Sequence, residues 1–161
     1  MPLDFIELAR LIETQAASLR LWVRSRCPSS DDVVQEAFCR LACQDPPPDN
    51  PTAWLYRVCR NLAEKQRLAD VRRRCREQAR SRPEQAANES ADSLEIAETL
   101  AAVEELDDHL REVLVARIWG GLSLEEIGRL CGISAATAFR RYEAALNSLR
   151  LKLDAKCEKR R

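Results

Sequence analysis

The chain has 161 residues, which is enough for one ordinary domain or for two small ones. Its 26 basic residues balance its 26 acidic residues, so the net charge indicates neither a nucleic-acid nor a membrane partner. Four glycines and 5% aromatic residues argue against an all-β chain rich in tight turns, so we predict an all-α protein.

Two stretches of the chain are basic, and a polar stretch separates them. Residues 57–76 contain eight basic and two acidic residues, and residues 137–161 contain eight and three. Residues 78–93 include no apolar side chain larger than alanine and cannot bury enough surface to fold alone. We therefore predict two helical domains, at 1–76 and 94–155, with a flexible linker at 77–93 and a basic tail at 156–161.

Three helices are expected in the first domain. Asp4 and Glu7 have the spacing of a capping box that would open the first helix, and Pro28 ends this stretch. The stripe that this helix is expected to bury consists of Ile6, Ala9, Ile12, Ala16, Leu19 and Val23.

Ser30 is expected to cap the second helix, and its pattern separates a buried side from an outward side. The buried side consists of Val34, Ala37, Phe38 and Leu41. The outward side consists of Asp32, Gln35, Glu36 and Cys39.

Asn50 and Pro51 are suited to the cap and first position of the third helix. Its inward stripe is predicted to be Leu55, Val58, Cys59 and Leu62, and its outward stripe Arg57, Arg60, Asn61 and Glu64. We expect Trp54 in the core and Tyr56 nearer the exposed side. An exposed tyrosine could stack on a nucleic-acid base, an interaction worth about 1 to 3 kcal/mol.

All four glycines lie within a short part of the second domain, where they separate helices. A helix from about Asp107 to Trp119 is expected to end at Gly120 and Gly121. Ser123 and Glu126 then have the spacing of a capping box for a short helix to Leu130.

A tight turn at Gly132 and a cap at Ser134 are expected to lead into a long final helix. Gly128 would let the two helices cross closely, with Ile127 and Ile133 in the core between them. This pattern predicts a helix-turn-helix.

One face of the final helix could enter a DNA major groove. Its inward residues are predicted to be Ala138, Tyr142, Leu146 and Leu149, and its outward residues Ala136, Thr137, Arg140, Ala144 and Asn147, with Arg141 at the edge. Arginine can donate two hydrogen bonds to guanine, and a threonine methyl group can contact thymine. A solvated helix face is the alternative, but the preceding turn favours DNA binding.

Seven cysteines within helical patterns indicate reduced thiols in the cytoplasm rather than a disulfide framework. Cys39 and Cys43 are one helical turn apart and could share a metal. With His109 as the sole histidine, ordinary thiols are the better interpretation, and we expect no metal or other cofactor.

Three blocks resemble the second and fourth regions of an extracytoplasmic-function (ECF) sigma factor in their order and separation. They are DDVVQEAFCRL at 31–41, PTAWLYRVCRNL at 51–62, and residues 111–153, which begin REVLVARIWGGLSLEEIGRL. The resemblance implies a dissociable specificity subunit of bacterial RNA polymerase, with core polymerase and promoter DNA as partners and an anti-sigma factor as a further candidate.

The resemblance also implies roles for particular residues. Asp32, Gln35 and Glu36 would contact the coiled coil of the polymerase clamp. Arg57, Arg60 and Asn61 would lie beside the promoter element nearest the start site, where unpaired nontemplate bases are trapped. Thr137, Arg140 and Arg141 would read the upstream element as duplex.

Residue chemistry adds further candidates to these two DNA-binding surfaces. Tyr56 and the basic run Arg72, Arg73 and Arg74 extend the predicted promoter-melting surface, and Ser134 and Asn147 extend the duplex-binding surface. Lys65 stands where the family commonly has an acidic residue, and Phe139 and Ala144 occupy positions that are often basic. The promoter sequence therefore does not follow from the resemblance.

Two other classes of function share some of these features. A stand-alone helix-turn-helix regulator would bind a palindrome as a dimer, and a protein-interaction bundle would use its basic segments only as solvated surface. An enzyme is disfavoured because the sequence has no Gly-rich phosphate loop and no cluster with metal-ligand spacing. We expect a cytoplasmic protein with no membrane partner, no catalytic residues and no small-molecule substrate.

Overall fold

The computed structural model describes residues 3–24, 26–76 and 94–158, and those residues form helices and loops without any strand. The predicted all-α fold is confirmed. The chain divides into two compact units, Met1–Ala86 and Ala87–Arg161. The predicted linker at 77–93 lies outside the described residues.

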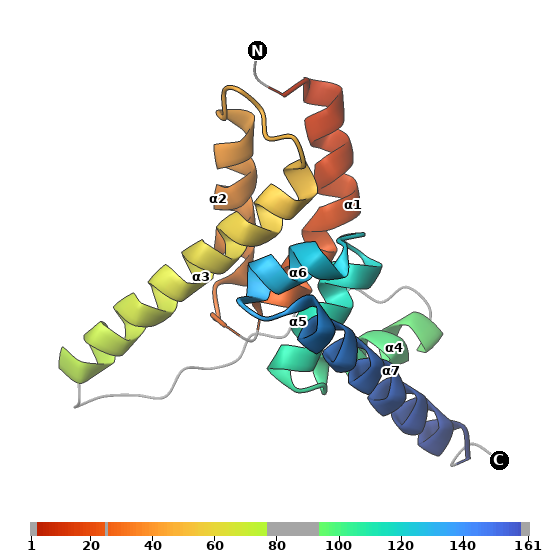
Figure 1. The fold of residues 1–161 in the computed structure, drawn as a ribbon. Coiled ribbons are helices and arrows are strands. Elements are labelled where there is room, and N and C mark those ends of the chain that lie inside the picture. The colour runs from red at the N-terminus through yellow and green to blue at the C-terminus, as the bar shows by residue number, and fades with distance from the viewer. Residues whose placement is uncertain (1–2, 25, 77–93, 159–161) are drawn as a thin grey trace. The chain divides into compact units, whose positions relative to one another are not determined.

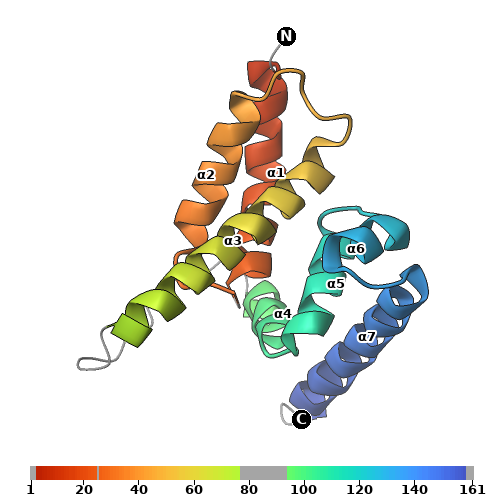
Figure 2. The same ribbon diagram turned by 60° about the vertical axis from the view of Figure 1, so that its left-hand side comes forward.

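The first unit is a bundle of three helices that all contact one another: α1 (Phe5–Val23), α2 (Ser30–Ala42) and α3 (Pro51–Arg76) (Figure 1). The largest fully buried side chains of this unit are Trp22, Tyr56, Leu19, Leu41 and Leu55. Both views show that the C-terminal part of α3 extends past the other two helices (Figure 2). This part of α3 therefore presents most of its circumference to solvent.

The packing of α1 differs from the prediction in its first half. Ala16, Leu19 and Val23 are buried as predicted, but Ile6 is 75% exposed and Ile12 is 42% exposed. All the buried residues of α1 lie between Ala16 and Val23. Helical periodicity identified the apolar side of α1, but it could not show where along that side the neighbouring helices begin to cover it.

Two of the three helices in the first unit start without a side-chain cap. Asp4 occupies the N-cap of α1 without any side-chain cap hydrogen bond, so the predicted capping box is absent. The N-cap of α2 is Ser29 rather than Ser30, and it also makes no such bond. The prediction for α3 is confirmed, because Asn50 Oδ1 accepts a 3.0 Å hydrogen bond from the Ala53 amide and the helix begins at Pro51.

The second unit contains α4 (Leu94–Glu104), α5 (Asp108–Ile118), α6 (Leu124–Cys131) and α7 (Ala135–Glu158). Sequence reasoning did not identify α4, which packs on α7. Helix α7 runs to Glu158, so the first residues of the predicted basic tail continue the helix.

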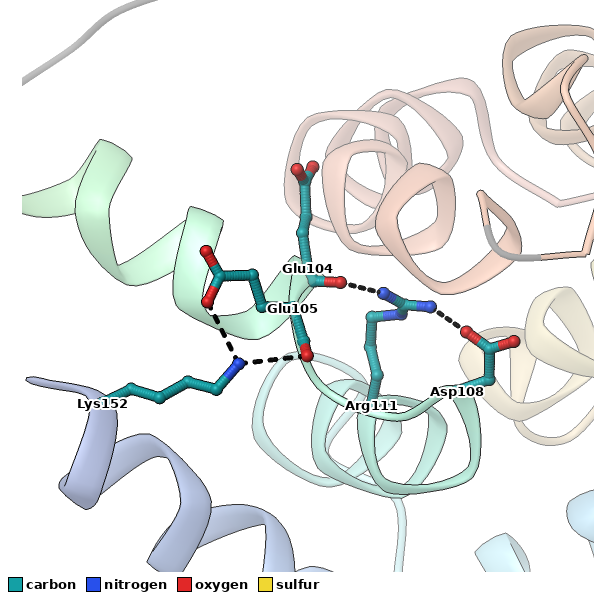
Figure 3. A network of polar contacts seen from close by, with 5 residues as sticks. All are labelled: Glu104, Glu105, Asp108, Arg111 and Lys152. Atoms are coloured by element: carbon teal, nitrogen blue, oxygen red, sulfur yellow. Dashed lines mark hydrogen bonds and ion pairs between the residues drawn. The ribbon is translucent and has the colours of Figure 1, made fainter. Parts of the chain in front are cut away.

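Polar contacts join the α4–α5 corner to the distal part of α7 (Figure 3). The buried Arg111 donates to the Glu104 carbonyl at 2.5 Å and pairs with Asp108. From α7, Lys152 Nζ donates to both the carbonyl and the carboxylate of Glu105, each at 3.1 Å. These contacts fix the distal part of α7 on the α4–α5 corner, and the start of α7 packs on α6.

No helix within the described residues combines the length and the apolar character that crossing a membrane requires.

Candidate polymerase and nucleic-acid interfaces

The predicted division of α2 into two sides is confirmed. Asp32, Gln35 and Glu36 are exposed, and the opposite side is buried through Val33, Val34, Ala37, Phe38 and Leu41. Glu36 pairs with Arg40 at 2.8 Å, and the neighbouring Asp31 pairs with Arg20 of α1 at 2.5 Å. The surface formed by Asp32, Gln35 and Glu36, which we call the α2 face, is thus polar and carried on a well-packed helix.

The outward side of α3 carries Arg57 and Asn61 in exposed positions and Arg60 in a half-buried one. One turn further on, Arg67 donates two hydrogen bonds to the Glu64 carboxylate, at 2.7 and 3.1 Å. These bonds hold the pKa of Glu64 below its usual value, and the positive charges of Arg26 and Arg60 act in the same direction. Glu64 therefore remains an anion among arginines and partly offsets their charge.

Arg26 is a member of this basic cluster that sequence reasoning missed. Its guanidinium carbon lies 6.0 Å from the centre of the Trp22 ring, and its charge acts on Glu64 of α3. Arg26 follows α1 and is far from Glu64 in the sequence, so no local pattern could have linked them. The α3 face, defined here as Arg57, Arg60 and Asn61, is thus flanked by a cation from another part of the bundle.

The basic run near the end of α3 is only partly described. Arg72 and Arg73 are exposed, and Arg73 pairs with Asp70 at 3.2 Å. The side chain of Arg74 lies outside the described residues.

Tyr56 does not belong to the exposed surface, and the prediction that it stacks a base is wrong. Its side chain is fully buried, its hydroxyl donates to Ser18 Oγ at 3.2 Å, and its ring meets Trp22 edge-on at 5.3 Å between centroids. Burial raises the pKa of Tyr56 to about 12. The residue is part of the core, and Trp54 instead is half-buried.

The physical reason is a rotation of the buried stripe of α3. Fully buried positions are Leu55, Tyr56, Cys59 and Ala63, whereas the predicted inward residues Val58 and Leu62 are only half-buried. At about 100° per residue, this shift moves the centre of the stripe toward Tyr56. Ser18 and Trp22 of α1 supply the partners that make a buried phenol favourable.

The helix-turn-helix of the second unit has the predicted local chemistry. Ser123 and Glu126 form a reciprocal capping box, with bonds of 2.8 and 3.1 Å, and Gly132 ends α6 in the left-handed conformation at φ 68°. A Cβ atom at Gly128 would lie 2.8 Å from the Ile133 carbonyl oxygen. Only glycine therefore permits this close approach of α6 to the turn.

Ser134, Thr137 and Arg140 form a chain of contacts at the start of α7. Ser134 Oγ accepts from the Thr137 amide at 3.1 Å and lies 2.9 Å from Thr137 Oγ1, to which Arg140 donates at 3.3 Å. This chain holds the Arg140 guanidinium near the helix start.

Burial along α7 agrees with the predicted outward side. Ala136, Arg140, Ala144 and Asn147 are exposed, Thr137 and Arg141 are half-buried, and the fully buried positions are Ala138 and Ala145. The predicted inward residues Tyr142, Leu146 and Leu149 are half-buried. We call Thr137, Arg140, Arg141 and Asn147 the α7 face.

Comparison with known proteins now identifies the class. Residues 96–149 match the family description "Sigma-70, region 4". The chain is 34% identical over 133 residues to the ECF RNA polymerase sigma factor EcfG of Rhodopseudomonas palustris, covering 74% of this chain and 68% of the relative.

Two solved structures have a similar fold. One is the sigma factor RpoE of Bartonella quintana, solved with the anti-sigma factor NepR, at a TM-score of 0.60 and 20% identity, covering 91% of this chain and 95% of that one. The other is CnrH, solved with the cytosolic domain of CnrY, at a TM-score of 0.55 and 26% identity, covering 94% of this chain and 90% of that one.

The chain belongs to the ECF sigma factors of bacterial RNA polymerase. As a member of this family it binds core polymerase and promoter DNA and directs the initiation of transcription. The sequence resemblance is thereby confirmed, and nothing favours the stand-alone regulator.

Proposed function

We propose that the three faces divide the work of initiation among them. The α2 face binds core polymerase, the α3 face holds the promoter element that melts, and the α7 face reads the upstream element as duplex. The observation that carries this proposal is the chain of Ser134, Thr137 and Arg140, which lies within the matched region 4 and follows a fully capped turn.

Duplex reading by the α7 face is supported by the chemistry at the start of that helix. Arg140 can form two hydrogen bonds with guanine, and the Ser134 end of the helix offers backbone amides to a phosphate. Arg141 and Asn147 extend the surface over the following turns. Ala136 and Ala144 are exposed on the same side of the helix, and their small side chains leave room for the edges of bases.

Melting by the α3 face is supported by its mixture of charge and hydrogen-bonding capacity. Arg57 and Arg60 can neutralise phosphates, and the Asn61 amide can pair with the edge of an unstacked base. A base captured in this way favours the melted promoter, because it is bound only in that state. The exposed Arg72 and Arg73 add phosphate contacts without sequence preference.

Binding to polymerase through the α2 face leaves the core of the first unit intact. Asp32 and Glu36 offer carboxylates and Gln35 offers an amide, all on one side of a helix. The protein itself carries out no catalytic step in this scheme, and it acts in the cytoplasm, where transcription takes place. A further partner is an anti-sigma factor, as in the complex of the similar RpoE with NepR.

The test is promoter-specific transcription with the full chain and core polymerase. Asp32→Lys with Glu36→Lys should weaken polymerase binding, whereas Glu7→Lys with Glu13→Lys on exposed positions of α1 changes the net charge equally and should not. Both pairs should leave stability within about 0.5 kcal/mol. Equal polymerase affinity of the two folded variants would remove the α2 face from the proposal.

The two DNA-binding faces are tested in the same assay. Asn61→Ala should impair open-complex formation on duplex promoters more than on a premelted template. Arg140→Ala should lose preference for particular upstream bases, whereas Arg150→Ala, which removes an exposed arginine from the same helix, should not. Uniform weakening on every upstream sequence by Arg140→Ala would contradict direct reading.

A further inference from the structure

Two exposed thiols lie on the same side of the helix as the α2 face, about one and two turns beyond its last residue. Cys39 and Cys43 are exposed, in contrast to the buried Cys27 and Cys59. At about 100° per residue, Cys39 and Cys43 point within about 40° of each other and between the directions of Gln35 and Glu36. A pair of thiols one turn apart therefore adjoins the surface assigned to polymerase binding, toward the C-terminal end of the helix.

The backbone keeps these two cysteines in helical register. Although Cys43 follows the last residue of α2, its amide donates to the Cys39 carbonyl oxygen at 3.2 Å. Residues at this spacing have Cβ atoms about 5 to 6 Å apart. A disulfide needs about 3.5 to 4.5 Å between Cβ atoms, so direct bonding would require the helix to distort.

A single bridging atom fits this spacing better than a disulfide does. Metal–sulfur bonds are about 2.3 Å long, so a centre bound to both sulfurs spans the pair without moving the backbone. Within the described ranges, no group of three or more histidine, cysteine, aspartate or glutamate residues could hold a metal ion. The pair thus suits soft centres that two thiolates satisfy, rather than tetrahedral zinc.

We propose that Cys39 and Cys43 form a two-thiol site for a thiophilic metal or metalloid, such as trivalent arsenic or Cu(I), and that its occupation blocks polymerase binding. The second half of this inference rests on the proposed role of the α2 face. An occupant bridging the two sulfurs would stand on the same side of the helix as Gln35 and Glu36, roughly 5 to 10 Å further along the axis. There it would obstruct a docking helix that continues past the α2 face.

The probe is phenylarsine oxide, which needs two thiols for a stable adduct. Two As–S bonds form, the bond between arsenic and oxygen breaks, and the two thiol protons leave with that oxygen as water. No atom is oxidised or reduced. A parallel titration with Cu(I) against a competing chelator shows whether the site also accepts a soft cation.

The full chain is treated with the probe, freed of excess by gel filtration, and only then mixed with core polymerase. One equivalent should be retained, and Cys39→Ser or Cys43→Ser alone should weaken retention about 100-fold or more because the chelate is lost. Cys131→Ser is the matched control and should retain the probe as the unmodified chain does. Loaded protein should lose polymerase affinity, whereas the Cys39→Ser, Cys43→Ser double variant should bind polymerase normally with or without the probe.

Two results would overturn the inference. The first is equal retention of the probe by the double variant, and the second is normal polymerase binding by the loaded protein. The Asp32→Lys, Glu36→Lys variant separates these failures from failure of the proposed function. If that variant loses polymerase binding while the loaded protein does not, the α2 face stands and the inference alone is wrong.

Discussion

The two units specify their helices in different ways. In the second unit, the boundaries of the helix-turn-helix are set by neighbouring residues: a reciprocal capping box at Ser123, a left-handed glycine at Gly132 and a cap at Ser134. In the first unit, only α3 has a side-chain cap, from Asn50, whereas the N-caps of α1 and α2 make no side-chain bond and these two helices depend on the shared core. Contacts distant in sequence therefore define α1 and α2 of the first unit, and local chemistry defines the helix-turn-helix of the second.

This difference matters for the proposed function because each unit carries a proposed binding surface on a helix. The α7 face begins directly after the turn, so the capping residues also position Arg140. The α2 and α3 faces lie opposite buried side chains such as Leu41 and Leu55. A core substitution should therefore disturb the first unit, whereas loss of a cap or a glycine should disturb the second.

The largest expected effect comes from Tyr56, which joins α3 to α1. Tyr56→Ala should lower the free energy of unfolding of the first unit by about 3 to 5 kcal/mol, because it leaves a cavity beside Trp22. Tyr56→Phe keeps the ring and removes only the bond to Ser18, so it should cost about 1 kcal/mol. Peptide-resolved hydrogen exchange of the full chain measures the stability of each unit separately. If Tyr56→Phe instead impaired DNA opening at unchanged stability, the residue would belong to the DNA surface.

Tyr56 also shows where prediction from the sequence ended in the first unit. The all-α fold, the start of α3 and the two sides of α2 followed from periodicity and turn residues. The rotation of the α3 stripe and the exposure of Ile6 did not, because they depend on which neighbouring helix covers each position. A hydrophobic period gives the direction of a stripe only to within about one residue.

The helix-turn-helix was predicted almost completely, because each of its boundaries is chemically marked in the sequence. The exposure of the α2 face, and of Arg140 and Asn147 in the α7 face, also followed from helical spacing. Their assignment to polymerase and DNA depended on the family resemblance, since exposed polar residues alone do not name a partner. Arg26 and α4 were missed, the first because its partner is distant in sequence.

Alkaline pH should lower the stability of the first unit, because it removes protons from groups buried in the same core. Burial raises the pKa of Tyr56 from 10.0 to about 12 and the pKa of Cys59 from 9.0 to about 12. The unfolded chain then loses these protons first, so the stabilisation is complete below pH 9 and is lost as the pH rises toward 12. For Tyr56 the lost stabilisation is about 3 kcal/mol. Denaturant titrations at several pH values should show that the free energy of unfolding of the first unit falls less with rising pH in Tyr56→Phe. Tyr142→Phe in the second unit should leave the fall for the first unit unchanged.

Glycine substitutions should separate close packing from backbone conformation in the second unit. Gly128→Ala places a Cβ atom 2.8 Å from a backbone oxygen and should cost about 1 to 3 kcal/mol. Gly132→Ala meets nothing within 4 Å but keeps a φ of 68°, so its cost should be about 1 to 2 kcal/mol and come from the backbone alone. Gly132→Asn should cost less than Gly132→Ala, because asparagine tolerates this conformation, whereas Gly128→Asn should cost no less than Gly128→Ala. A recovery of stability by asparagine at both positions would indicate that a Cβ atom at position 128 does not clash with the backbone.

The smallest expected effect gives the most direct contrast between the units, because it uses the same substitution at two N-caps. Ser123→Ala removes the acceptor of the Glu126 amide bond and should cost the second unit about 1 kcal/mol. Ser29→Ala removes a hydroxyl that makes no cap hydrogen bond, so the first unit should change by less than about 0.5 kcal/mol. Both residues start a helix that carries or adjoins a binding face, so the comparison is matched in position and in chemistry. Peptide-resolved hydrogen exchange should show faster opening at the start of α6 in Ser123→Ala and an unchanged start of α2 in Ser29→Ala. Equal losses of stability at both sites would mean that Ser29 caps α2 in solution. Local capping would then define the start of α2 as it defines the start of α6.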